Sequence, residues 1–300
     1  MASQRDVRNR ISSVKNIQKI TRAMEMVAGA RLRRAEQRIE ALRPYADAIR
    51  RMTRQAARDA GAEASQLPLL TVHEQQTKIG LLLITGDRGL AGAFNSQVIR
   101  AGVQATRELA EEGLTSDWYA TGRRGVSSLT FRGLELSGSY TGFSDRPSYA
   151  DARTVADDLM TGYVDGHLDR VDIVYNAYVS PLTQHVTRET LLPIAQATIA
   201  GEEQDAEGER TDGPRALVEY EPSPEEILRR LVPDYVEISI YRALVESAAG
   251  FYGAQMTAMR NASENAGELI TTYTLQMNRA RQAEITQEIL EVVAGAEGLS

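Results

Sequence analysis

The segment most able to carry chemistry is a glycine-rich stretch, ITGDRGLAGAFN, at residues 84–95. It follows an apolar run typical of a strand and precedes a helical pattern, and backbone N–H groups at such a turn often bind phosphate. Its glycines Gly86, Gly89 and Gly92 are spaced three apart, which matches neither the dinucleotide fingerprint nor the phosphate loop, and the chain contains no Gly-Lys pair. We therefore interpret the stretch as a tight turn that needs glycine dihedral angles.

Other catalytic signatures are missing from the sequence. The chain has no Cys, which excludes disulfides, thiolate metal sites and Cys nucleophiles. It has no G-x-S-x-G elbow, and His73, His167 and His185 lack metal-ligand spacing. We predict no catalytic residue, no metal and no cofactor, and expect that the chain is not an enzyme by itself. A nucleotide-dependent enzyme built on the central residues stays open as an alternative, on fold analogy alone.

The charge is distributed unevenly along the chain. Residues 1–59 carry 13 Arg and 2 Lys against 6 acidic residues, a net charge of +9, whereas the remainder carries 19 basic and 35 acidic residues, a net charge of −16. A basic arm on an acidic body suggests an acidic partner for the arm, although a solvated helix face has the same composition. Nucleic acid is not expected as a partner, because the arginines are not interleaved with aromatic residues.

No segment predicts a signal peptide or a membrane span. The start, MASQRDVRNR, is charged and lacks the apolar run of a secretory signal. The apolar run IGLLLI at residues 79–84 is far shorter than the roughly 20 residues that a membrane helix needs. We expect any membrane association to come through a partner.

Two long helical patterns occupy the ends of the chain, and these must position any binding surface. In residues 3–59 apolar side chains recur at helical steps, at Val7, Ile11, Val14, Ile17, Met24, Val27, Ala35, Leu42 and Ile49. Pro44 is expected to kink or break this helix. In residues 234–293 one heptad series comprises Ile238, Val245, Tyr252, Met259, Ala266, Tyr273 and Ala280, and a second lies three residues on, at Tyr241, Ala248, Gln255, Ala262, Leu269, Gln276, Ala283 and Leu290.

Strands alternate with helices between these two ends. Strands are predicted at 79–85, 117–121, 171–179 and 185–193, with helices at 95–112 and 148–168, a pattern typical of a largely parallel sheet. The predicted fold is therefore α/β, a long antiparallel coiled coil of the N- and C-terminal helices plus a central Rossmann-like α/β domain. We place the domains at 1–75, 76–222 and 223–300, and interpret the acidic segment 201–214 as a solvated loop.

Three segments resemble one family in its own order. The run RNRISSVKNIQKITRAMEMVAGARLRRAEQRIEALRPYA at residues 8–46 is similar to the opening helix of the γ subunit of F-type ATP synthase. The run AQMTAMRNASENAGELITTYTLQMNRARQAEITQEILEVVAGAEGL at 254–299 is similar to its closing helix, and TGDRGLAGAFN at 85–95 to the turn after its first central strand. The family usually lacks glycine at Gly250 and Gly253, so these residues are expected to soften the helix.

The resemblance implies a non-catalytic rotary central stalk. Its paired helices would turn inside a hexamer of α and β subunits, and its foot would contact the ε subunit and the membrane ring of c subunits, so that proton flow is coupled to ATP synthesis. This role places the chain at the cytoplasmic face of the cell membrane as a peripheral subunit. A generic coiled-coil adaptor with other partners shares the helices and stays open as an alternative.

The resemblance also implies positions of contact with the β subunit. Met24, in KITRAMEMVA, corresponds to the family position that faces an acidic β loop. In NRARQAEITQEI, the positions where the family's closing helix meets a β loop are Arg281, Gln282, Thr286 and Glu288.

Overall fold

The computed structural model describes residues 4–61, 67–194, 221 and 223–297. These form two compact units, described separately here: residues 1–30 with 255–300, and residues 31–254. Helices α1 (Gln4–Ala60) and α6 (Pro224–Glu297) each contribute to both units. The predicted loop at 201–214 lies outside the described residues, and the three proposed domain boundaries stay a prediction. None of the described helices combines the length and apolarity needed to cross a membrane.

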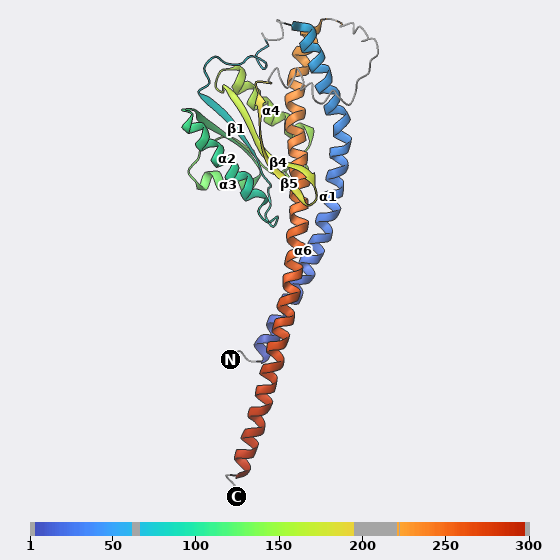
Figure 1. Ribbon diagram of the computed structural model, residues 1–300, viewed down its shortest axis with the longest axis vertical. Coiled ribbons are helices and arrows are strands. Elements are labelled where there is room, and N and C mark those ends of the chain that lie inside the picture. Colours follow the sequence, from blue (N-terminus) through green and yellow to red (C-terminus); the bar gives the residue numbers. More distant parts are fainter. Residues whose placement is uncertain (1–3, 62–66, 195–220, 222, 298–300) are drawn as a thin grey trace. The chain divides into compact units, whose positions relative to one another are not determined.

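A five-stranded sheet forms the centre of residues 31–254 (Figure 1). In the order β3-β2-β1-β4-β5, its strands are β3 (Leu136–Tyr140), β2 (Thr115–Thr121), β1 (Lys78–Ile84), β4 (Arg170–Ser180) and β5 (Thr183–Leu192). The first four strands run parallel, and β5 pairs antiparallel with β4. The prediction of a largely parallel α/β sheet is confirmed.

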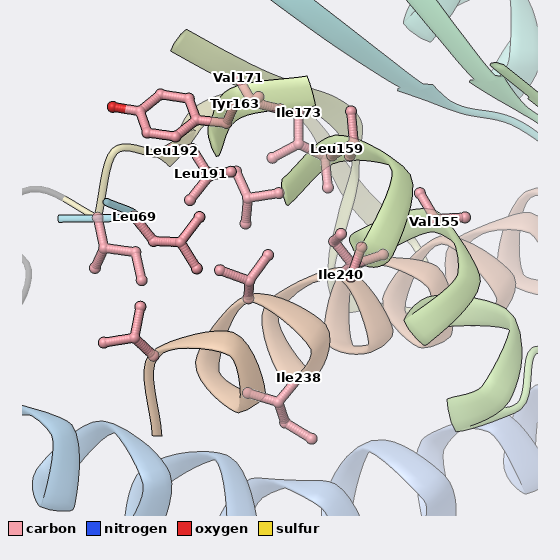
Figure 2. Packing of buried hydrophobic residues seen from close by; sticks show 14 of the residues in the cluster. Leu69, Val155, Leu159, Tyr163, Val171, Ile173, Leu191, Leu192, Ile238 and Ile240 are labelled. Atoms are coloured by element: carbon pink, nitrogen blue, oxygen red, sulfur yellow. The ribbon is translucent and has the colours of Figure 1, made fainter. Parts of the chain in front are cut away.

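The two faces of the sheet bury alternate residues of each strand, as the pleat requires. Leu81 and Leu83 of β1 pack with Trp118 against α2 (Phe94–Glu111) and α3 (Arg123–Phe131). Leu82 and Ile84 belong to the core on the opposite face, which α4 (Tyr149–Val164), α1 and α6 cover. Figure 2 shows the side chains that α4, β4 and α6 contribute to this second core.

Local capping explains where two helices begin. At α4, the Ser148 hydroxyl accepts the N–H of Asp151 at 3.3 Å, and the Asp151 carboxylate accepts the N–H of Ser148 at 2.8 Å, which is a capping box. At α6, the Ser223 hydroxyl accepts the N–H of Glu226 at 3.2 Å. Helix α6 therefore begins ten residues before the predicted start at Asp234.

Both long helices continue through an internal proline, so α1 has no break at Pro44, and the alternative of a kink there stays a prediction. Pro44 is exposed, so the backbone donor it lacks is missing from the solvent side of α1, while half-buried Leu42 and buried Ile49 hold the helix on the core. Pro233 lies between buried Val232 and Val236 in the same way.

The sequence did not predict α3 and β3. Helix α3 has only nine residues, and β3, LSGSY, alternates between half-buried and exposed side chains, with Ser, Gly and Ser between Leu136 and Tyr140. Short elements of this kind carry little hydrophobic periodicity.

Candidate partner-binding surface

The glycine-rich turn after β1 is closed by hydrogen bonds within the protein. The Thr85 hydroxyl donates to the carbonyl of Thr121 at the end of β2, at 2.8 Å. The N–H of Gly86, which a bound phosphate would need, donates to Oδ1 of Asn95 at 2.8 Å. This supports the interpretation of a structural turn.

A buried carboxylate, that of Asp87, joins the loops that follow three neighbouring strands. Its side chain is 5% exposed and accepts backbone N–H groups from Arg123 at 3.0 Å, Gly142 at 3.0 Å and Ser144 at 3.1 Å, and the Ser144 hydroxyl at 2.8 Å. Burial alone would raise the pKa of Asp87, but these hydrogen bonds outweigh it and hold the pKa below its usual value. The carboxylate therefore fixes the carboxyl edge of the sheet.

The crevice where parallel α/β sheets bind ligands is filled by aromatic side chains. That crevice lies at the carboxyl ends of β1 and β4, where the strand order changes direction. Phe94 and Phe251 meet edge to face there, with ring centroids 5.6 Å apart, and the Asn176 amide donates to the Phe94 carbonyl at 3.3 Å. A Cβ on Gly86 would lie 3.1 Å from the Phe251 ring. This packing does not favour a nucleotide-dependent enzyme.

The described residues hold no group of three His, Asp or Glu side chains placed to bind a metal ion.

Two glycines of α6 permit close packing of this helix against the α/β domain. A Cβ on Gly253 would lie 2.8 Å from the carbonyl oxygen of Pro181, and one on Gly250 would lie 3.2 Å from the Phe94 ring. Close packing therefore explains why glycine stands at positions 250 and 253. The expectation that these glycines soften the helix stays a prediction.

In the unit of residues 1–30 and 255–300, α1 and α6 run antiparallel. The Glu25 carboxylate pairs with Arg260 at 2.9 Å, and the position a Cβ would take on Gly29 lies 3.4 Å from the sulfur of Met256. The equivalent position on Gly267 lies 3.2 Å from the Gln18 amide nitrogen. The residue numbers of each pair sum to 285, so each residue of α1 lies beside the α6 residue whose number completes that sum. The predicted antiparallel pairing is confirmed.

The seam between the two helices follows alternating steps of four and three residues, as in coiled coils. On α1 its buried and half-buried members are Val7, Ile11, Val14, Gln18, Thr21, Glu25 and Ala28. On α6 they are Met259, Ser263, Ala266, Ile270, Tyr273, Met277 and Ala280. The first predicted heptad series of α6 is thus buried or half-buried throughout.

The second predicted series is wrong from residue 269 on. Leu269, Gln276, Ala283 and Leu290 are exposed. In the seam the companion of the first series lies four residues after each member. The position three residues after lies roughly 100° around the helix from that companion, on the solvent side.

A second apolar stripe of α1 lies outside the seam. Ile17, Ile20 and Val27 are 52%, 58% and 52% exposed, and Met24 between them is half-buried. Their steps of three, four and three residues place all four on one helix face. The apolar periodicity of residues 3–59 ran through both Ile17 and buried Ile11, so it predicted the helix without separating this stripe from the seam. Exposed apolar residues gathered on one face mark a surface for a partner.

Helix α6 extends beyond its partner helix. The residue numbers of facing pairs sum to 285, so Gln4, the first described residue of α1, lies beside Arg281. Residues 282–297 therefore have no described α1 residue next to them; Figure 1 shows this end of α6 in red. This overhang is about 24 Å long at 1.5 Å per residue, and all its side chains from 282 to 294 are exposed.

Three of the four predicted contact residues of α6 lie on this overhang, and the fourth, Arg281, directly precedes it. With a rotation of roughly 100° per residue, Arg281, Gln282, Thr286 and Glu288 span roughly 160° of the helix circumference. Inside that arc lie four exposed apolar side chains that sequence reasoning missed, Ile285, Ile289, Val292 and Val293. Ile289 follows Ile285 by four residues, and Val292 and Val293 follow Ile289 by three and four; this helical spacing is the signal that could have found them.

Met24 belongs to a different place on the helix pair. Because facing residue numbers sum to 285, Met24 lies beside Asn261. Asn261 precedes Arg281 by twenty residues, a distance of roughly 30 Å along α6. The structure therefore groups the four predicted residues of α6 with one another, and Met24 with the stripe of α1.

Comparisons with known proteins agree with this architecture. A family model described as ATP synthase matches residues 3–299. The ATP synthase gamma chain of Rubrobacter xylanophilus is 43% identical over 300 residues, covering 100% of this chain and 99% of the relative. That of Moorella thermoacetica is 43% identical over 299 residues and covers 100% of both.

Two solved structures have a similar fold. A chain of the OSCP/F1/c-ring part of the Euglena gracilis mitochondrial ATP synthase has a TM-score of 0.65 at 19% identity, covering 99% of this chain and 94% of that chain. A chain of the central stalk and c-ring of the Tetrahymena thermophila mitochondrial ATP synthase has a TM-score of 0.58 at 23% identity, covering 81% and 99%.

Proposed function

This chain belongs to the ATP synthase family, whose gamma chains it matches along its whole length, and we propose that it turns as the central shaft of the assembly. As a member of the gamma chains it is a non-catalytic subunit. The shaft transmits torque between a membrane ring of c subunits, driven by proton flow, and the catalytic β subunits, and thereby couples proton flow to ATP synthesis.

The overhang of α6 is the observation that carries this proposal. A helix end of sixteen residues that exposes apolar and charged side chains is costly in water and favours insertion into a partner. Its apolar side chains supply contact area without specific pairing, which suits a surface that turns against its surroundings. A shaft shifts the conformations of its partners only if each orientation contacts those conformations unequally.

We assign the contacts with the β subunit to the two apolar surfaces of the helix pair. Arg281, Gln282, Thr286 and Glu288 rim the apolar side chains of the overhang, and Met24 lies on the stripe of α1. The excess positive charge of residues 1–59 suits acidic loops of a partner.

The remaining partners belong to the same proposal. They are the α subunits of the hexamer, the ε subunit and the c ring, and the chain reaches the membrane only through that ring. We place it as a peripheral subunit at the cytoplasmic face of the cell membrane.

The composition of the complex tests the proposal first. Native mass spectrometry of material purified through a tag on this chain should give one copy of it with three copies each of two larger nucleotide-binding subunits. Recovery of the free chain or of a self-dimer alone would point to a generic adaptor.

Serine substitutions test the overhang itself. Ile285→Ser combined with Ile289→Ser should leave folding unchanged, because these side chains are 48% and 58% exposed in the free chain. In the assembled enzyme the double variant should lower the number of protons pumped per ATP hydrolysed. Val164→Ser, at a 52% exposed position of α4, is the matched control. Normal assembly and normal coupling in the double variant would contradict the assigned surface.

A further inference from the structure

A cavity of about 330 Å³ within residues 31–254 is lined mainly by arginines. Its lining residues are Arg31, Arg34, Ala35, Arg38, Asp145, Arg146 and Tyr252. Four guanidinium groups thus face one carboxylate, which leaves an excess of three positive charges. Like charges held close together repel one another, and a bound anion would relieve that repulsion.

The single carboxylate is already shared between two arginines. Asp145 Oδ2 lies 3.7 Å from Nη1 of Arg31 and 3.2 Å from Nη2 of Arg88. In the part of the chain that the structure describes, no carboxylate lies within ion-pair distance of the other three lining arginines, which are Arg34, Arg38 and Arg146. These three guanidinium groups keep their donors for a ligand.

One wall of the cavity is held in shape before any ligand binds. The Arg31 guanidinium carbon lies 5.7 Å from the centroid of the Tyr252 ring, and the Tyr252 hydroxyl donates to the Asp145 carbonyl at 3.1 Å. Arg34 and Arg38 follow Arg31 at helical steps of three and four residues, so α1 sets all three on one face. A site fixed in advance loses less conformational freedom on binding.

We propose that this cavity binds a phosphate anion, inorganic phosphate or the linked phosphates of pyrophosphate. Arginine forks match phosphate oxygens in paired hydrogen bonds, and several forks around one anion require a ligand with several oxygens. The volume is at the low end of the roughly 300–1,000 Å³ of ligand pockets, which suits a compact anion. This site is separate from the surfaces assigned to the β subunit and does not depend on the torque role.

Arginine modification of the full-length chain by phenylglyoxal, read peptide by peptide in a mass spectrometer, tests the site. With the anion at about ten times its Kd, modification of Arg34, Arg38 and Arg146 should slow about tenfold, because only the free fraction reacts. Arg33, an exposed neighbour on α1 that does not line the cavity, should react at an unchanged rate. Separate series with phosphate and pyrophosphate identify which anion the cavity prefers.

Matched variants make the test specific. Arg34→Gln and Arg146→Gln, both at exposed positions, should each weaken pyrophosphate binding about tenfold by calorimetry, as loss of a charged hydrogen bond implies. Arg33→Gln makes the same change of charge and should leave the affinity unaltered. Equal protection by sodium chloride at the same ionic strength, equal slowing at Arg33, or protection only by a polyglutamate peptide would overturn the proposal.

Discussion

The carboxylate of Asp87 offers the sharpest test of how the α/β domain is held together. Three backbone N–H groups and one hydroxyl converge on it at 2.8 to 3.1 Å, and its side chain is only 5% exposed. Asp87→Asn preserves the shape but replaces one acceptor oxygen with a donor nitrogen, which leaves at least one buried N–H without an acceptor. Hydrogen bonds to a charged group contribute about 1.5–3 kcal/mol, so we expect a loss of about 3 kcal/mol in the free energy of unfolding.

The assay is urea unfolding of the full-length chain, followed by fluorescence of Trp118. This residue is the only tryptophan in the sequence and is 2% exposed in the core beside α2, so its emission reports on this domain. Asp117→Asn, on the neighbouring strand, is the control, because Asp117 forms a partly exposed ion pair with Lys78 at 2.8 Å and should cost less than about 1 kcal/mol.

The effect of Asp87 should also depend on pH. Its pKa is lowered in the folded state, so the stabilisation is present above the unfolded value of 3.8 and is lost as the pH falls through the folded value. The difference between the wild-type chain and Asp87→Asn should therefore shrink in acid. A loss no larger than that of Asp117→Asn at pH 7, or a difference that grows as the pH falls, would refute the reasoning.

Three further changes have defined outcomes. Asp169→Asn should lower the free energy of unfolding, measured in urea, by about 2 kcal/mol at pH 7 and by almost nothing near pH 2. Burial alone would raise the pKa of Asp169, but backbone N–H donors outweigh it and hold the pKa at about 2, against 3.8 in the unfolded chain. Gly253→Ala should lower the free energy of unfolding by about 1–3 kcal/mol, since its Cβ would lie 2.8 Å from the Pro181 carbonyl oxygen. Gly29→Ala, whose Cβ would have no contact closer than 3.4 Å, should raise it by about 0.5–1 kcal/mol. The opposite order of the two variants in thermal unfolding would contradict both predictions. Met24→Lys should leave assembly intact but lower coupling, because an added cation would pair with the acidic β loop that we propose Met24 faces; normal proton pumping per ATP would count against the assigned contact.

The long helices and the first heptad series of α6 were predictable because their repeats extend over many turns, but the face that α1 buries was not. The seam of α1 includes the polar residues Gln18, Thr21 and Glu25, while apolar Ile17 and Ile20 point to solvent. A helix with two partners has two apolar stripes, and hydrophobicity alone does not say which stripe meets a helix of the same chain.

The parallel sheet could be predicted from the alternation of strands and helices, because the apolar runs at β1 and β4 are long enough to recognise as buried strands. The role of Asp87 could not be predicted, since its partners Arg123, Gly142 and Ser144 lie 36 to 57 residues away along the chain. The four proposed contact residues of α6, Arg281, Gln282, Thr286 and Glu288, came from family resemblance alone. The structure adds the apolar side chains that they surround, and these were visible as a short helical repeat.

The close packing of Gly250 and Gly253 has a mechanical consequence. Without side chains at these positions α6 has a flat side, and the backbone of Pro181 and the side chain of Gln184 lie directly against it. Turning α6 about its own axis would bring a bulkier neighbour to this place and push the β4–β5 hairpin away. This contact fixes the rotation of α6 about its own axis relative to the sheet. Within residues 31–254, a torque applied to α6 is therefore passed to the sheet.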